Sequence, residues 1–213
     1  IRSPDFFFTT QPAVYELAYD FGRMRRAIGL GTPMDWILGN HEARLDRAVF
    51  TNLIASAALK PADEPATAPN LITMERLLGT AALGIDVRGP YPNGEVWLNP
   101  NLVCVHGDIA RSGEGATARA ILSHASASVI YGHLHRIELL HTTHHGMRGA
   151  RRYLACCPGT VARVDGRVPA ATRRVNWQQG FAVVEYEEGD FDSGEGLFHV
   201  EVVPIHEGRA VWR

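Results

Sequence analysis

The sequence contains little cysteine, and what it has is poorly spaced for cross-linking. Only three of the 213 residues are cysteines, too few for the disulfide framework of a small secreted domain. Cys156 and Cys157 are adjacent, and neighbours on a strand point to opposite faces, which disfavours a bridge between them. No CxxC spacing accompanies them. We expect buried thiols in a reducing cytoplasm, with a metal site as the alternative.

Long apolar runs and an excess of one charge are also absent. No stretch reaches the length of a membrane-spanning helix, and no signal-peptide pattern occurs at the start. The net charge is −2 with histidine neutral and no long basic run appears, so a non-specific grip on duplex DNA is not indicated. Two small arginine clusters are expected to be solvated surface, with phosphate contact as the alternative: Arg148, Arg151 and Arg152, and Arg173 and Arg174.

Histidine does not occur in the first forty residues, but it then appears in three short segments that each follow a predicted strand. The segments are Gly39-Asn40-His41-Glu42, Val105-His106-Gly107-Asp108 and Gly132-His133-Leu134-His135. The runs before them, at 34–38, 101–105 and 128–131, are short and rich in β-branched or aromatic residues, as in buried strands. Side chains at strand ends can converge at one edge of an α/β sheet and form a metal centre.

The candidate ligands are Asn40, His106, His133 and His135. Imidazole nitrogens together with an amide oxygen suit manganese, iron, nickel or zinc better than calcium. Any one of these residues alone is more often structural, but the combination favours metal binding. Three other histidines, at 141, 144 and 145, occupy a predicted turn between strands. We expect these to be solvated, with a second metal cluster as the alternative.

The remaining pattern predicts an α/β fold of one domain over residues 1–213. Helices are predicted at 11–28 with Pro12 in the first turn, and at 41–59, 71–83 and 113–123, while residues 60–70, with three prolines, form a loop. Further strands are predicted at 97–105, 137–143, 153–157, 181–186 and 197–204. The change from alternating helices and strands to consecutive strands fits a two-sheet β-sandwich flanked by helices.

The order of the three histidine motifs resembles the calcineurin-like metallophosphoesterases, which carry GNH[DE], then a His before Gly, then GHxH. The run Asn176-Trp177-Gln178-Gln179-Gly180-Phe181 is similar to the tail of bacteriophage and prophage members. The resemblance implies a hydrolase with two divalent ions, which cleaves phosphodiester or phosphomonoester bonds by a metal-activated hydroxide. Its substrate would be a nucleotide or nucleic acid, with no membrane partner and an open oligomeric state. The compartment would be the cytoplasm, that of a bacterial host if the gene is phage-borne.

The resemblance also implies roles for particular residues. Asn40, His106 and His133 would bind one ion and His135 the other. His41 would point to the substrate and assist the leaving group; in the alternative it caps the following helix.

Three polar neighbours of these residues have roles suggested by their positions. Glu42 would support the helix start and orient His41, and Asp108 would hold a ligand histidine by a hydrogen bond. Arg44 would reach phosphate or form a surface ion pair.

Two earlier motifs of that family, Asp-x-His and Gly-Asp-x-x-Asp, do not occur before Gly39, and the chain opens on Ile1. We therefore expect a C-terminal portion that lacks its first strands and leaves apolar helix faces open, including the stripe at 14–21. The alternative is a homologue that lost half its site and acts as a binding module. Neutral ligands alone leave two cations repelling each other, so this chain by itself should hold at most one ion weakly and show little turnover.

Overall fold

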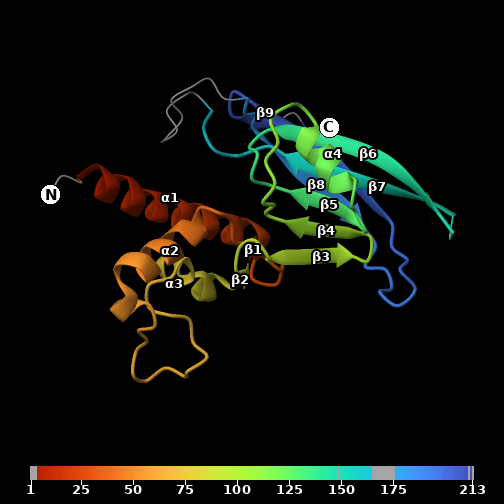
Figure 1. Cartoon of the computed structure of the whole chain (residues 1–213). Helices are drawn as coiled ribbons and strands as arrows, with labels where there is room; N and C mark the ends of the chain where they lie inside the picture. Colours follow the sequence, from red (N-terminus) through yellow and green to blue (C-terminus); the bar gives the residue numbers. More distant parts are fainter. Residues whose placement is uncertain (1–3, 148, 165–175, 211, 213) are drawn as a thin grey trace. The chain divides into compact units, whose positions relative to one another are not determined.

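The structure is a computed structural model that describes residues 4–147, 149–164, 176–210 and 212. It is a mixed α/β structure with several sheets (Figure 1). Its contacts divide the chain into two compact units, Ile1–Tyr91 and Pro92–Arg213. The single domain expected over residues 1–213 stays a prediction.

The first unit is mainly helical and carries one two-stranded parallel sheet, β1 with β2. Its elements are α1 (Pro4–Ile28), β1 (Asp35–Ile37), α2 (Glu42–Asn52), η1 (Ile54–Ser56), α3 (Met74–Leu78), η2 (Thr80–Leu83) and β2 (Asp86–Arg88). The loop at 60–70 contains neither helix nor strand, as predicted. The predicted start of the first helix was wrong, because α1 begins at Pro4 and encloses Pro12. A proline removes one hydrogen bond of a helix but does not oblige the helix to begin there.

The apolar stripe of α1 lies in the core of the first unit. Val14 and Phe21 are only 6% and 7% exposed and cluster with Leu78 and Ile85, and the Phe21 ring meets Trp36 edge-on at 5.3 Å. The expectation that this stripe is open was therefore wrong, because α3 and the residue before β2 cover it.

Arg25 is a buried cation that ties the end of α1 to two turns. The whole residue is only 5% exposed. Nε donates to the Leu83 carbonyl at 2.6 Å and Nη2 to the Gly84 carbonyl at 2.6 Å. Nη1 donates to the carbonyls of Gly29 at 2.9 Å and Thr32 at 2.7 Å. The guanidinium thus supplies hydrogen-bond donors to carbonyls at the helix end and in the turn before β2.

Replacing Arg25 with methionine should therefore destabilise the first unit. The variant keeps an apolar stem but removes the guanidinium donors of four carbonyls, so we expect a loss of about 2 kcal/mol or more in the free energy of unfolding. Urea denaturation followed by circular dichroism measures it. Arg26→Met, at an exposed neighbour on the same helix, is the matched control and should change stability by about 0.5 kcal/mol or less. Equal effects in the two variants would contradict the role assigned to Arg25.

In its described residues the second unit contains two sheets and one helix. Its elements are β3 (Glu95–Asn99), β4 (Leu102–Val105), α4 (Ala116–Leu122), β5 (Ser128–Tyr131), β6 (Ile137–Gly146), β7 (Gly149–Pro158), β8 (Gly180–Tyr186), β9 (Phe198–His206) and β10 (Arg209–Ala210). The larger sheet has the order β3-β4-β5-β7-β6 and the smaller the order β10-β9-β8. Strands β4, β5 and β7 run parallel, whereas β3 and β6 are antiparallel to their neighbours.

Two sequence expectations about the strands were wrong. The single strand at 97–105 is a hairpin of β3 and β4. Pro100 has no N–H for the ladder, and the buried Asn99 side chain accepts from Asn101 N at 2.9 Å, which closes the turn. The three strands before the histidine motifs do not share one sheet, because β1 pairs with β2 whereas β4 and β5 are neighbours in the larger sheet.

The core of the second unit lies between α4 and the larger sheet. It contains Ala118 and Leu122 from the helix, and Tyr131, Leu134, Ala155 and Cys157 from the sheet and its loops. All three cysteines are free thiols, and Cys156 and Cys157 are buried, as predicted. Burial raises the pKa of Cys156 to about 12 and also raises that of Cys157. Both thiols are therefore protonated packing groups at neutral pH.

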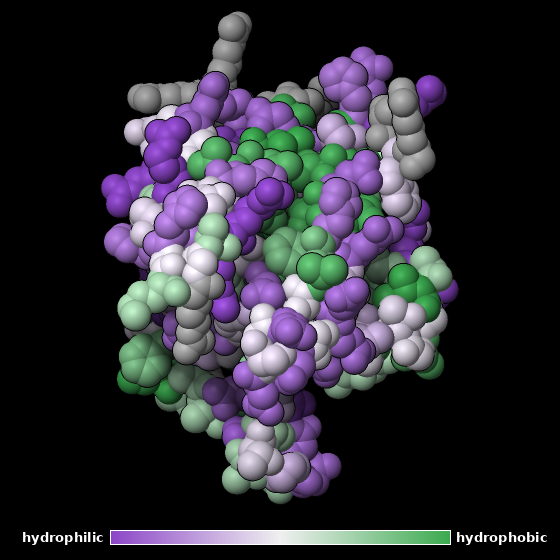
Figure 2. Space-filling model, turned by 90° about the vertical axis from the view of Figure 1, so that its right-hand side faces the viewer, coloured by the Kyte–Doolittle hydropathy of each residue, from purple (hydrophilic) through white to green (hydrophobic). Residues whose placement is uncertain are grey.

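Apolar and polar residues are unevenly distributed on the surface. On the face drawn in Figure 2, hydrophobic residues gather in one area bordered by hydrophilic ones.

Among the helices in the described ranges, none is long and apolar enough to cross a membrane.

Candidate functional site

His106 and His133 come from neighbouring parallel strands and lie side by side. Val105 pairs with Tyr131 in the register of β4 and β5, so both chains leave the sheet at the same level. Gly132 N then donates to the His106 carbonyl at 2.9 Å, which continues the pairing past the strand ends. The two imidazole rings stand 5.6 Å apart between centroids, at an interplanar angle of 68°. The predicted convergence of these two histidines is confirmed.

The loop that carries His133 and His135 has an unusual backbone. Both residues have positive φ, 70° and 60°, in the left-handed region that side-chain-bearing residues rarely adopt. Leu134 between them is buried in the core, and its N–H donates to the Gly132 carbonyl at 2.8 Å. The apolar anchor at Leu134 thus fixes the loop, and both flanking histidines stay half-exposed. Strained backbone of this kind concentrates at functional sites.

Residues Trp177 and Gln178 hold the end of this loop. The Trp177 ring meets the His135 imidazole edge-on, with 4.5 Å between centroids. Gln178 N donates to the His135 carbonyl at 3.0 Å, and Gln178 Oε1 accepts from Ile137 N at 3.0 Å. The segment before β8 is therefore a support for the His135 side of the site.

A buried carboxylate, Glu138, links both ends of the histidine loop to α4. Its oxygens accept from the Tyr131 hydroxyl at 2.7 Å, from Arg136 Nε at 2.7 Å and from Ala118 N at 3.1 Å. A further bond comes from Gly115 N at 3.1 Å. Tyr131 precedes the loop and Arg136 follows it, so the Glu138 side chain connects the two ends of the loop by hydrogen bonds. The Glu138 side chain is 3% exposed.

These contacts shift the acidity of both partners. Burial alone would raise the pKa of Glu138, but hydrogen bonds from Tyr131, Arg136 and Ala118 lower it below the ordinary value of a glutamate. The pKa of Tyr131 is raised well above its usual range, first by burial and then by the adjacent carboxylate. Glu138 is therefore ionised and Tyr131 protonated at neutral pH, a charge-assisted pair.

The first histidine motif lies in the other unit, at the turn from β1 to α2. Glu42 Oε2 accepts from Gly39 N at 2.7 Å, so this carboxylate closes the turn that presents Asn40. His41 occupies the N-cap position of α2 but makes no capping bond with its side chain, which argues against the capping alternative. His41 and Arg44 are exposed and Asn40 is half-buried.

The other described residues singled out in the sequence lie at exposed positions or on the hairpin of β6 and β7. Asp108 is exposed, and its support of a ligand histidine stays a prediction. The histidines at 141, 144 and 145 lie on β6 rather than in a turn: His141 and His145 are exposed and the His144 ring packs on Tyr153 at 4.9 Å. Arg151 and Arg152 are exposed on β7, and the predicted clusters' other members, Arg148, Arg173 and Arg174, fall outside the described residues.

The donor chemistry of the histidine pair can be compared with that of a metal site. With metal–nitrogen bonds of about 2.1 Å, two imidazoles on one tetrahedral ion stand about 5–5.5 Å apart between centroids. The separation of 5.6 Å between His106 and His133 lies just above this spacing. Over the ranges that the structure describes, no group of three or more His, Cys, Asp or Glu side chains could hold an ion. The pair therefore fits part of a coordination sphere, which needs further ligands to be complete.

Sequence reasoning missed the two supports of the loop. Glu138 is a lone carboxylate in the apolar run Ile137-Glu138-Leu139-Leu140, and a charge at such a position signals a buried, paired group. Trp177 drew attention only through resemblance to other sequences, and nothing in its own spacing indicated a contact with His135. Comparison with known proteins identified no matching family model, no matching curated protein and no matching solved structure.

Proposed function

We propose that this chain, or a longer protein of which it is part, is a metal-dependent phosphoesterase of the calcineurin-like type that acts on nucleotides or nucleic acid. The observation that carries the proposal is the pair of imidazoles at the ends of neighbouring parallel strands, 5.6 Å apart, beside a strained and firmly anchored loop. The two sheets of the second unit, with β8 and β9 beside β7, are compatible with the sandwich of that fold.

In this proposal His106 and His133, with Asn40, hold one divalent ion and His135 holds a second. Bound ions of this kind polarise the phosphoryl oxygens and supply a nucleophile at neutral pH. His41, exposed at the start of α2, donates a proton to the leaving-group oxygen, a contribution of about 10²–10⁴-fold. Glu42 and Glu138 position the loops, because their hydrogen bonds close the turns that carry the ligands.

A binding module is the second candidate. The observation that favours it is that the described residues bring two imidazoles together but no third side chain of the His, Cys, Asp or Glu type. Such a protein would bind a phosphate ester through the same loops without cleaving it.

The test is a metal-dependent substrate screen of this chain and of any longer, full-length protein that contains it. Each is stripped with EDTA and then supplied with Mn²⁺ or Zn²⁺. Bis-p-nitrophenyl phosphate, cyclic nucleotides, single-stranded DNA and a phosphopeptide are offered side by side. We expect metal-dependent cleavage of the diesters by the full-length protein and little turnover by the present chain. Cleavage that persists in EDTA would refute the proposal, a strong preference for the phosphopeptide would overturn the substrate class, and binding without cleavage in both proteins would favour the module.

A further inference from the structure

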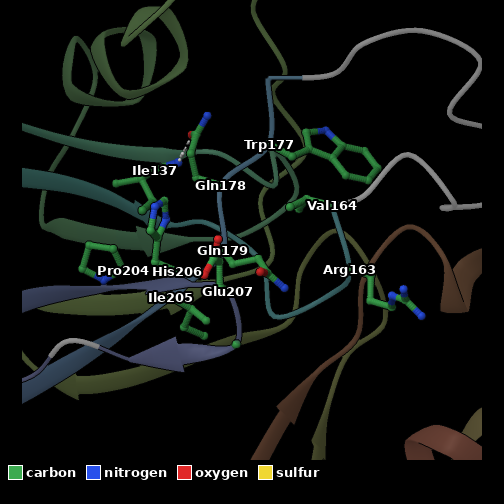
Figure 3. Close-up of a pocket in the computed structure, with 11 residues that line it drawn as sticks. Ile137, Arg163, Val164, Trp177, Gln178, Gln179, Pro204, Ile205, His206 and Glu207 are labelled. Atoms are coloured by element: carbon green, nitrogen blue, oxygen red, sulfur yellow. Dashed lines mark hydrogen bonds between the residues drawn. The ribbon is translucent and has the colours of Figure 1, made fainter.

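A cavity of about 750 Å³ lies in the second unit, next to the support of His135. Its lining includes Ile137 at the start of β6, and Trp177 and Gln179 from the segment before β8. It also includes Ile205 near the end of β9 and Glu207 in the turn that follows. Figure 3 shows Trp177 and Val164 at one side, Ile137 and Pro204 at the other, and Gln179 and Glu207 between them. The volume lies within the range of about 300–1,000 Å³ that small-molecule sites occupy.

The lining combines one indole with two oxygen acceptors. Trp177 is half-buried and contributes its indole ring to a lining that also includes the aliphatic side chains of Ile137 and Ile205. Gln179 Nε2 is committed to the Ala162 carbonyl at 2.9 Å, so its Oε1 is the atom of this carboxamide that can accept from a ligand. The carboxylate of Glu207, an exposed residue, is a second acceptor. A flat ring with amino hydrogens at its edge would match this set.

The cavity is coupled to the histidine loop through direct contacts. The Trp177 ring meets the His135 ring edge-on, with 4.5 Å between centroids. Ile137 lies two residues after His135, and its N–H donates a hydrogen bond to Gln178 Oε1. Arg163 lies at the rim, on the side of Trp177 and Val164 (Figure 3). A ligand in the cavity therefore has an aromatic platform next to a candidate metal ligand and a cation at the margin.

We propose that this cavity binds the nucleobase of a nucleotide ester, and that it prefers bases with an exocyclic amino group, such as adenine. The base stacks on Trp177 and donates to Gln179 and Glu207, while its phosphate lies toward the histidine loop. This inference rests on the proposed function and adds the part of the substrate that is recognised.

Isothermal titration calorimetry of the whole chain in EDTA tests the cavity without any turnover. The probes are adenosine monophosphate, uridine monophosphate and ribose 5-phosphate. We expect adenosine monophosphate to bind about tenfold more tightly than ribose 5-phosphate, the order of effect of one base-stacking aromatic, and more tightly than uridine monophosphate. Equal affinity for adenosine monophosphate and either of the other two probes would overturn the proposal.

Three variants locate the binding. Trp177→Leu keeps apolar bulk but removes the π face, so the preference over ribose 5-phosphate should disappear. Glu207→Gln, at an exposed turn position, should reduce the same ratio even if the tryptophan variant folds poorly. Trp97→Leu, at an exposed position on β3, is the control and should leave the ratio unchanged; an unchanged ratio in Glu207→Gln would overturn the proposal.

The two proposals fail in different ways. Binding of adenosine monophosphate that depends on Trp177, with no metal-dependent hydrolysis, leaves the cavity assigned and removes the phosphoesterase. Hydrolysis of simple diesters without discrimination between adenosine monophosphate and ribose 5-phosphate removes the cavity and leaves the phosphoesterase.

Discussion

Replacing His133 with glycine should abolish divalent-ion binding by this chain without weakening its fold. The imidazole supplies a nitrogen ligand beside His106, and even the loss of a partner that only orients a ligand lowers metal affinity about 10–100-fold. Removal of the ligand itself should exceed that, and the full-length protein should lose phosphodiester hydrolysis by at least about 100-fold. Calorimetric titration with Mn²⁺ and Zn²⁺ and hydrolysis of bis-p-nitrophenyl phosphate give the two measurements.

The backbone at His133 makes this variant informative. Its φ of 70° is strained for a residue with a Cβ but ordinary for glycine, so the variant should be no less stable than the parent in urea. His133→Ala loses the same ligand but keeps the strain, so it should bind ions equally poorly. His141→Gly, at an exposed position on β6, is the control for the loss of any histidine. Unchanged ion affinity in both His133 variants would refute the assignment of this residue as a metal ligand.

Sequence periodicity located the strands that carry the site because those strands have short, uniform patterns. The strand before Gly132 was predicted with the boundaries that β5 has, Ser128–Tyr131. Its four residues are buried or half-buried and lie between β4 and β7 in the larger sheet, so both of its faces favour apolar side chains. The pairing of His106 with His133 followed from the parallel order of two such strands.

What the sequence did not reveal depends on contacts between distant segments. The hairpin within 97–105 is fixed by Asn99, whose Nδ2 donates to the Glu187 and Leu197 carbonyls at 3.1 Å, about ninety residues away in the chain. The separate pairing of β1 with β2 involves Asp86–Arg88, a strand too short for any period to be visible. Trp177 meets His135 although the two residues are about forty positions apart in the sequence. Local patterns specify elements, whereas these partners are chosen by the folded chain.

Replacing Glu138 with glutamine should destabilise the second unit by about 3 kcal/mol at neutral pH, within the range for breaking a buried ion pair. The amide has one acceptor oxygen in place of two, so its NH₂ group faces either the donors to Oε2, from Ala118 and Tyr131, or the donors to Oε1, from Gly115 and Arg136. The charge of Arg136, only 16% exposed in its side chain, is then left without its carboxylate. Glu201→Gln, at an exposed position on β9, is the matched control, with an expected change of about 0.5 kcal/mol or less.

The pH dependence separates this charge effect from a simple packing defect. The pKa of folded Glu138 is lowered, whereas the unfolded chain titrates near the ordinary value of about 4.3. The stabilisation is therefore fully present above the unfolded pKa and is lost as the pH falls through the lower, folded pKa. The difference in unfolding free energy between parent and Glu138→Gln should be largest near neutrality and shrink in acid below about pH 4. Urea denaturation at a series of pH values measures it. A difference that stays constant or grows in acid would mean that packing, rather than the ionised carboxylate, holds the histidine loop to α4.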